Sequence, residues 1–286
     1  MGVANASWVQ LEPGTFEARC GSVDAAPLVL RHRTFTVGFK AEAGVPPRTQ
    51  MIGIAADSRT SARWFGSAAD VENIAASCSS VEVSTVGPSA FYTVSVDVPA
   101  LARCFPNAPD TTALLDALQP RRLSRDPLSA RRLRTAMSRA FARPDAPAAA
   151  LHGSLVPLLS SALGRMDSHA VEHSKCLNRR LAAVRTCERY MREHAGAGLT
   201  LLDLSEIAGM RSRSLINAFE AVTGFSPMDY LKRIRLDGAR RALRRADKAT
   251  TRIIDVASDW GFWHMGHFAL DYRAMFGETP SQTLLA

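Results

Sequence analysis

The feature that most constrains the fold of this 286-residue chain is a pattern that occurs twice near its end, in residues 202–219 and 254–272. Ser205 and Ala257 lie 52 positions apart, as do Gly209 and Gly261. A second set of equivalent residues lies 53 positions apart: Phe219 and Tyr272, Gly224 and Gly277, Pro227 and Pro280. Self-similarity at a fixed spacing indicates one structural unit that is used twice.

Each copy has the features of a helix-turn-helix. A small residue, Ser205 or Ala257, lets two helices approach closely, and the glycine four positions later suits a corner with positive φ. The second helix ends before a glycine, as a C-cap requires. Its predicted core stripe is Leu215, Phe219 and Val222 in the first copy and Phe268, Tyr272 and Met275 in the second.

Two start signals place the helix boundaries. Thr200 and Asp203 have the spacing of a capping box for the first helix. Ser226 followed by Pro227 supplies an N-cap and a proline at the first helical position. These residues predict a long helix from 227 to about 246, which would lie between the two units and set their separation.

Charge is distributed unevenly along the chain. Residues 1–120 hold 8 Lys+Arg and 11 Asp+Glu, whereas residues 178–286 hold 17 and 12. A basic back half indicates a polyanionic partner, and together with the repeated small-residue and glycine spacing it favours DNA binding over a helical hairpin without a nucleic-acid role. Residues 121–143 carry 8 Arg and 1 Asp. For this Arg-rich stretch we favour a solvent-exposed helix face over an arm that contacts phosphates.

Residues from about 180 to 285 resemble the AraC/XylS family of bacterial transcription regulators. The most specific part is 261–281, which matches the family signature of Gly-Phe, a later aromatic residue and then Phe-Gly-x-x-Pro. The resemblance implies a regulator that activates transcription through contact with RNA polymerase, with repression as the alternative. The first 120 residues are loosely similar to the cupin-like effector domains that precede this module.

The second helix of each unit is expected to enter the major groove, where each base pair presents a distinct pattern. With the core stripes facing inward, the predicted base contacts are Arg213, Asn217, Gly266, His267, Leu270 and Arg273. Arg213 suits a guanine and Asn217 an adenine. Family members often carry polar residues where Gly266 and Leu270 stand, so methyl contact, His267 and backbone positioning are expected there. The predicted phosphate contacts are helix N-termini together with Arg211, Ser212, Thr251 and Arg252.

The front of the chain reads as short strands rich in Val, Thr, Phe and Ile. Candidate strands are 16–20, 28–37, 49–55, 81–86 and 91–96, with a helix near 69–76. This pattern predicts a small sandwich or barrel. The predicted fold class is α+β, with a β-rich, cupin-like effector or regulatory domain at 1–118, a helical linker at 119–177 and an all-α DNA-binding domain with two helix-turn-helix units at 178–286.

Apolar residues between 148 and 195 recur at helical spacing. Such a stripe buries itself against another surface, so we expect contact with a partner subunit or with the front domain. Dimerisation through 148–176 is a hypothesis that follows from this stripe.

Other candidate sites are weaker. His169, His173 and Cys176 would share one helix face and could chelate a metal, but a polar helix surface is favoured, and no cofactor is predicted. Residues 1–120 contain only His32, which argues against a metal-dependent cupin enzyme, and we expect no enzymatic activity. The strand aromatic residues could line an effector pocket, although plain core is favoured: Trp8, Trp64, Phe65, Phe91 and Tyr92.

The five cysteines form no CxxC pair, and neither a secretory signal nor a membrane span is visible, so a cytoplasmic location without a membrane partner is expected. The leading prediction is a one-component regulator, a possible homodimer, whose front domain binds an unknown small molecule or partner and whose back domain binds double-stranded DNA. One alternative is a ligand-independent regulator controlled by another protein. The other is a small-molecule-binding or enzymatic front domain with a vestigial DNA-binding module.

Overall fold

The structure is a computed structural model, and it describes residues 6–104, 121–166 and 175–286. The chain divides into two compact units. The first, here called the β unit, comprises residues 1–8 and 17–172, and the second, the helical unit, comprises 9–16 and 173–286. Within the described ranges, each helix is too short or too polar to cross a lipid bilayer.

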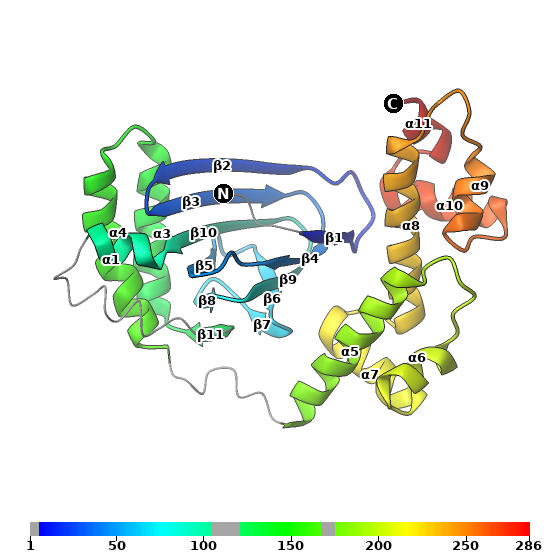
Figure 1. The fold of residues 1–286 in the computed structure, drawn as a ribbon, viewed down its shortest axis with the longest axis horizontal. Coiled ribbons are helices and arrows are strands. Elements are labelled where there is room, and N and C mark those ends of the chain that lie inside the picture. Colours follow the sequence, from blue (N-terminus) through cyan, green and yellow to red (C-terminus); the bar gives the residue numbers. More distant parts are fainter. Residues whose placement is uncertain (1–5, 105–120, 167–174) are drawn as a thin grey trace. The chain divides into compact units, whose positions relative to one another are not determined.

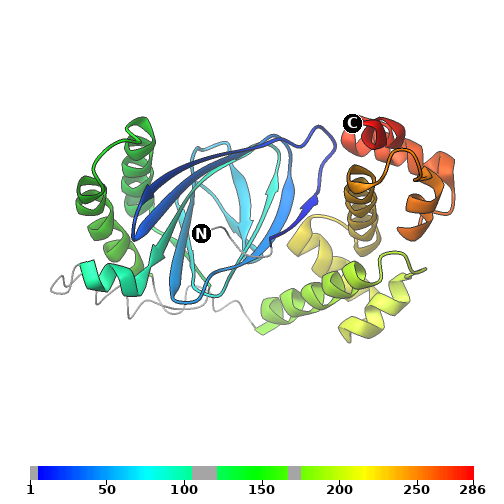
Figure 2. The same cartoon turned by 45° about the horizontal axis from the view of Figure 1, so that its top comes forward.

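Two antiparallel sheets form the β unit, and they face each other across its interior (Figure 1, Figure 2). The five-stranded sheet has the order β1-β4-β9-β6-β7, and the six-stranded sheet has the order β11-β8-β5-β10-β3-β2. The strands are β1 (Ser7–Gln10), β2 (Ala18–Ala25), β3 (Leu28–Phe35), β4 (Phe39–Gly44), β5 (Thr49–Ala55), β6 (Ser61–Trp64), β7 (Ser67–Ala69), β8 (Asn73–Ser77), β9 (Ser80–Val86), β10 (Ser89–Asp97) and β11 (Arg122–Arg125).

Helices α3 (Pro127–Ala142) and α4 (Ala148–Gly164) cover the outer face of the six-stranded sheet, and α1 (Val98–Cys104) follows β10 (Figure 1). Alternation along β3 produces this arrangement: Leu28 and Leu30 are fully buried in the core shared with the two helices, whereas Arg31 and Arg33 face the other sheet. Asp126 caps α3, because its Oδ1 accepts a hydrogen bond from the backbone N–H of Ser129 at 3.0 Å.

The predicted helix near 69–76 is wrong, because this region forms β7 and β8 instead. Strand β8 pairs with β5 on one side and with β11 on the other, and Ile74, Ala75 and Ala76 are all buried. Alanine favours a helix intrinsically, but pairing on both edges and burial on both faces override that preference. The predicted set also lacks the strands β1, β4, β6 and β11.

Most of the apolar stripe of α4 is buried inside the β unit itself. Leu151, Leu155, Leu159 and Leu163 all belong to the core that α3 and α4 share with the six-stranded sheet. Of the two surfaces expected for this stripe, the front domain is therefore the one that covers it. Dimerisation through 148–176 stays a prediction, and residues 167–174 lie outside the described ranges.

The helical unit contains α5 (Lys175–Glu193), α6 (Leu201–Ala208), α7 (Ser212–Thr223), α8 (Pro227–Arg245), α9 (Ile253–Asp259), α10 (Met265–Phe276) and α11 (Pro280–Leu285). The segment 9–16 packs within this unit, where the backbone N–H of Gly14 donates to the carbonyl of Met275 at 2.9 Å. The overall α+β class, with a β-rich first part and a helical second part, is confirmed, whereas the cupin-like description of the first part stays a prediction.

Candidate nucleic-acid interface and effector cavity

The first repeat forms a pair of crossed helices, α6 and α7. The capping box that opens α6 is present, since Thr200 Oγ1 accepts from the backbone N–H of Asp203 and the Asp203 carboxylate accepts from the backbone N–H of Thr200 at 2.7 Å. Gly209 ends α6 with φ 60°, the left-handed conformation predicted for the corner. Ser205 is buried where the helices meet, and its hydroxyl contacts that of Ser212 at 3.0 Å.

Helix α7 buries one face and exposes the other. Its inward residues are Leu215, Ala218, Phe219 and Val222, which join α5, α6 and α8 in one core. The opposite face carries Arg213, Ser214, Asn217 and Glu220, all exposed. The predicted base contacts of this helix therefore lie on its free surface.

The second repeat forms the same pair of helices, α9 and α10. Ala257 is fully buried at the crossing, and Gly261 makes the corner with φ 77°. The inward face of α10 consists of Phe268, Tyr272, Met275 and Phe276. All four predicted base contacts of its outward face are exposed: Gly266, His267, Leu270 and Arg273. Only His267 and Arg273 have polar side chains, and the apolar Leu270 is 70% exposed.

The predicted phosphate contacts lie at the beginnings of α7 and α9. Arg211 and Arg252 occupy the N-cap positions and are exposed, while Ser212 and Thr251 are half-buried. Arg252 Nε lies 3.9 Å from Asp255 Oδ2, so its charge is partly compensated. These positions suit anion contacts, since the first turn of a helix presents free N–H groups and a positive dipole end. Their roles stay predictions, as do those of the base contacts.

Helix α8 joins the two units and belongs to both of their cores. Tyr230, Leu231 and Ile234 pack with α7, whereas Leu236, Ala239 and Leu243 pack with α9 and α10. Ser226 caps this helix, as predicted from the sequence, with its hydroxyl accepting from the backbone N–H of Asp229. One continuous helix of 19 residues therefore fixes the two helix-turn-helix units in a single body.

The structure adds residues that the sequence reasoning missed. Arg179 and Arg180 of α5 line a hollow of about 450 Å³ together with Arg211, Ser214 and Asn217 of the first unit. Trp263, just before α10, is 69% exposed. Arg179 and Arg180 lie at the start of the basic segment, so their charge is visible in the sequence. Their position beside the first helix-turn-helix unit follows only from the packing of α5 on α7.

A second candidate site is a cavity of about 280 Å³ inside the β unit, between the two sheets. Trp8, Trp64 and Phe91 line it, so these three of the five aromatic residues singled out in the sequence surround a cavity rather than a filled core. Tyr92 instead points to the outer face, where its ring lies 4.7 Å from that of His32. Phe65 is buried beside Trp64 and is not part of the lining.

Glycine at position 53 gives Trp64 its place in the cavity wall. A Cβ built on Gly53 would lie 2.6 Å from Cη2 of Trp64, so a larger residue would displace the indole. Trp64 belongs to the five-stranded sheet, and it contacts Phe91 of the six-stranded sheet edge-on, with ring centroids 5.6 Å apart. The result is an aromatic wall that is completed by Phe35 and Phe39.

Two arginines give the cavity a positive character. Arg31 Nη1 donates to Ser95 Oγ at 3.3 Å, and Arg33 Nη1 donates to Thr93 Oγ1 at 3.2 Å. Burial lowers the pKa of the Arg33 guanidinium from its ordinary value, although arginine stays charged at neutral pH. A partly buried positive charge beside apolar rings is a favourable partner for an anionic group.

No metal site emerges from the described side chains, among which no group of three or more His, Cys, Asp or Glu is placed to hold an ion. His169 and His173 of the predicted metal cluster lie outside the described residues, and the side chain of Cys176 does as well.

Comparisons with known proteins agree with the geometry. A family model described as a helix-turn-helix domain matches residues 204–286. The "XylDLEGF operon transcriptional activator 2" of Pseudomonas putida is 36% identical over 130 residues, which is 46% of this chain and 77% of that protein. The "Probable thc operon regulatory protein" of Rhodococcus erythropolis is 40% identical over 101 residues, which is 35% of this chain and 30% of that protein.

Among solved structures, a probable AraC family transcriptional regulator from Rhodopseudomonas palustris is 42% identical, and the match covers 36% of this chain and 94% of that one with a TM-score of 0.34. The structure of ToxT from Vibrio cholerae matches 98% of this chain and 96% of its own at 8% identity and a TM-score of 0.34.

Paired helix-turn-helix units on one connecting helix define a DNA-binding protein. The match to the Pseudomonas putida activator covers more than two thirds of that protein at well over 30% identity. The chain belongs to the AraC/XylS family of transcription regulators.

Proposed function

We propose that this chain is a one-component transcription regulator, which binds promoter DNA through its helical unit and a small molecule through its β unit. The observation that carries the proposal is the pair of exposed second helices, α7 and α10, held by α8 in one body. Regulators and activators among the relatives support it. By the same analogy, the regulator acts as an activator that contacts RNA polymerase.

The two units would read successive major grooves on one face of the duplex, ~34 Å apart by the spacing rule for such motifs. In the first groove, Arg213 and Asn217 supply hydrogen bonds to base edges. In the second groove, Leu270 and Gly266 supply apolar and backbone contacts, with His267 and Arg273 beside them. Arg211, Ser212, Thr251 and Arg252 then hold the phosphates. Most sequence discrimination therefore belongs to α7.

The chemistry of the β-unit cavity indicates the class of effector. Its aromatic and aliphatic lining suits a small, flat or branched apolar body, and Arg31 and Arg33 suit one anionic group, such as a carboxylate. A volume of about 280 Å³ limits the ligand to a small molecule. This effector class agrees with the leading prediction of a small-molecule sensor.

Selection of bound fragments from a pool of random duplexes, with and without a panel of small aromatic and aliphatic carboxylates, tests the proposal. The expected result is a motif with two separated conserved blocks, the stronger one lost when Arg213 is replaced. A carboxylate that binds the cavity should change the yield of that motif. Enrichment of one short block only, or of no motif, would contradict the two-groove reading.

Two alternatives are separated from this proposal by simple measurements. A regulator governed only by another protein would show no thermal stabilisation of the β unit by any small carboxylate, because only a ligand that binds the folded form raises stability. A front-half enzyme would consume such a ligand during incubation. The predicted homodimer is tested by sedimentation, in which a monomer at micromolar concentration would count against it.

A further inference from the structure

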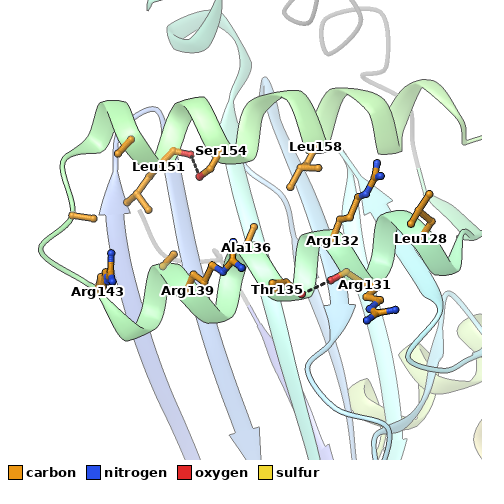
Figure 3. A pocket seen from close by; sticks show the side chains of 13 residues that line it. Leu128, Arg131, Arg132, Thr135, Ala136, Arg139, Arg143, Leu151, Ser154 and Leu158 are labelled. Carbon is orange, nitrogen blue, oxygen red and sulfur yellow. Dashed lines mark hydrogen bonds between the residues drawn. The ribbon is translucent and has the colours of Figure 1, made fainter.

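An open groove runs between α3 and α4 on the outside of the β unit, and neither DNA binding nor the cavity between the sheets uses it (Figure 3). The two helices are connected by a short turn and lie side by side, with side chains from both pointing toward the space between them. The groove has a volume of about 570 Å³. Helices of 16 and 17 residues make it about 24 Å long.

The floor of this groove is apolar and made largely of small side chains. Ala136 and Ala140 of α3 face Ala150, Leu151 and Leu158 of α4. Small residues let another helix approach closely. Leu128 lines one end of the groove and is 53% exposed, so it extends the apolar surface that the floor presents.

The rim of the groove is strongly basic. Arg131, Arg132, Arg139 and Arg143 line it, and all four are exposed. Among the described residues none of these four forms an ion pair, although other arginines of the same stretch are engaged: Arg125 with Glu72, and Arg134 with the carbonyls of Ala55 and Val71. Four uncompensated positive charges therefore surround one apolar floor.

We infer that this groove binds an acidic amphipathic helix of another protein. Its apolar stripe would cover the alanine and leucine floor, and carboxylates on both edges would meet the arginine rim. A second copy of this face is a poorer occupant than an acidic helix, because it would bring two sets of four arginines together. A dimer that forms through 148–176 would compete with the helix for this surface. Duplex DNA does not fit either, since a rigid duplex would leave the recessed apolar floor uncovered. The Arg-rich stretch, which has no role in the proposed DNA recognition, would thus serve to bind a protein partner.

A synthetic probe tests the inference with the full chain. The probe is an 18-residue fluorescent peptide with leucines at i, i+4, i+7 and i+11 and glutamates on both flanking faces. Binding is followed by fluorescence polarisation in 0.15 M NaCl, with excess random-sequence duplex present to occupy the DNA-binding face. The expected result is saturable binding that weakens as salt is raised, because exposed charges are screened.

Matched charge reversals separate the groove from net charge. The double variant Arg132→Glu, Arg139→Glu should weaken binding at least about tenfold, since two attractive contacts become repulsive. The control Arg48→Glu, Arg59→Glu changes net charge equally at exposed positions that do not line the groove, and it should stay within about twofold of the original chain. Circular dichroism checks that each variant is folded.

Two further measurements give a result even if the charge-reversed variant misfolds. Ala150→Trp, at an exposed position, should block the floor and weaken binding without any change of charge. A probe with serine in place of each leucine should bind at least about tenfold more weakly. Three outcomes would overturn the inference. The first is an equal loss of binding in both charge-reversed variants, and the second is equal binding of the serine and leucine probes. The third is complete loss of binding when duplex is added.

Discussion

Gly238 of α8 lies directly against the indole ring of Trp260, the residue that ends α9: a Cβ built on Gly238 would lie 2.1 Å from Cζ3 of that ring. Gly238 is buried, and the half-buried Trp260 packs against the core of the helical unit. The missing side chain at position 238 is therefore the local reason why the second helix-turn-helix unit packs closely on the connecting helix.

Replacement of this glycine should destabilise the helical unit. We expect Gly238→Ala to lower its free energy of unfolding by ~1–3 kcal/mol, because the added methyl group would overlap the indole of Trp260 and displace it. Urea unfolding followed by tryptophan fluorescence measures the change. Gly266→Ala is the matched control, since a Cβ there meets nothing within 4 Å, and it should be neutral or slightly stabilising. Equal stability of the two variants would show that the indole does not occupy this position.

Loss of the Arg213 side chain should reduce both affinity and discrimination. We expect Arg213→Ala to weaken binding to the selected duplex by ~1–3 kcal/mol and to relax the preference at one base position. Electrophoretic mobility shifts on a set of single-base variants of the site measure both effects. Arg59→Ala removes an equal charge from the β unit and should bind like the original chain. An equal loss on every sequence would assign Arg213 to a phosphate instead.

Arg179 should contribute affinity without sequence preference. This side chain lines the hollow beside Arg211 and Asn217, at the edge of the surface assigned to DNA. Arg179→Ala is expected to weaken binding by a similar factor on all duplexes and to reduce the slope of log affinity against log salt by ~1, as the loss of one phosphate contact does. An unchanged slope would remove α5 from the interface.

The arginines of the β-unit cavity should make effector binding depend on a negative charge. A carboxylate found by thermal stabilisation should lose at least about tenfold in affinity for the Arg33→Gln variant, because a charge-assisted hydrogen bond is worth ~1.5–3 kcal/mol. The amide of the same molecule should bind weakly to both chains. Calorimetric titration measures all four combinations, with Arg59→Gln as a surface control. Equal affinity of acid and amide would contradict the assignment.

Burial should make Tyr272 a source of alkaline sensitivity. Its hydroxyl donates to Thr283 Oγ1 at 2.8 Å, and burial raises the pKa of the phenol to about 12. Because this value lies above that of an unfolded tyrosine, about 10, the protonated phenol stabilises the fold fully below pH 10. Its contribution is then lost as the pH rises from about 10 to about 12.

The Tyr272→Phe variant isolates this contribution. At pH 7 the variant should lose ~1 kcal/mol of unfolding free energy with its hydrogen bond. Between pH 8 and pH 11 the original chain should lose more stability than the variant, as measured by urea unfolding at each pH. If the two proteins lose the same amount, the phenol is not the titrating group.

Features set by neighbouring residues were predicted well. The capping box at Thr200 and Asp203, the glycine corners and the start of α8 at Pro227 depend on contacts within a few residues, so the sequence contains them completely. The faces of α7 and α10 followed from helical periodicity, because one face of each helix is strongly apolar.

Features set by distant strands were not predictable in this way. The alanine-rich segment around Ile74 becomes β8 only because β5 and β11 are available on its two sides. The cavity depends on Gly53 standing opposite Trp64, two residues on different sheets whose proximity no local pattern reveals. Arg179 likewise reaches the surface of α7 through helix packing that its own segment does not encode.

The strands β3 and β10 separate the cavity between the sheets from the helices α3 and α4, so residues on both faces of this wall have defined contacts. Arg33 and Phe91 face the cavity between the sheets. His32 and Tyr92, their immediate neighbours in sequence, face the other way and pack against Phe141 of α3. An effector would contact one side of this wall, whereas a helical partner would bind α3, which packs on the other side. If the wall transmits binding from one side to the other, the coupling is reciprocal, and each occupant changes the affinity of the other by the same factor. One domain would then integrate a metabolite signal and a protein signal.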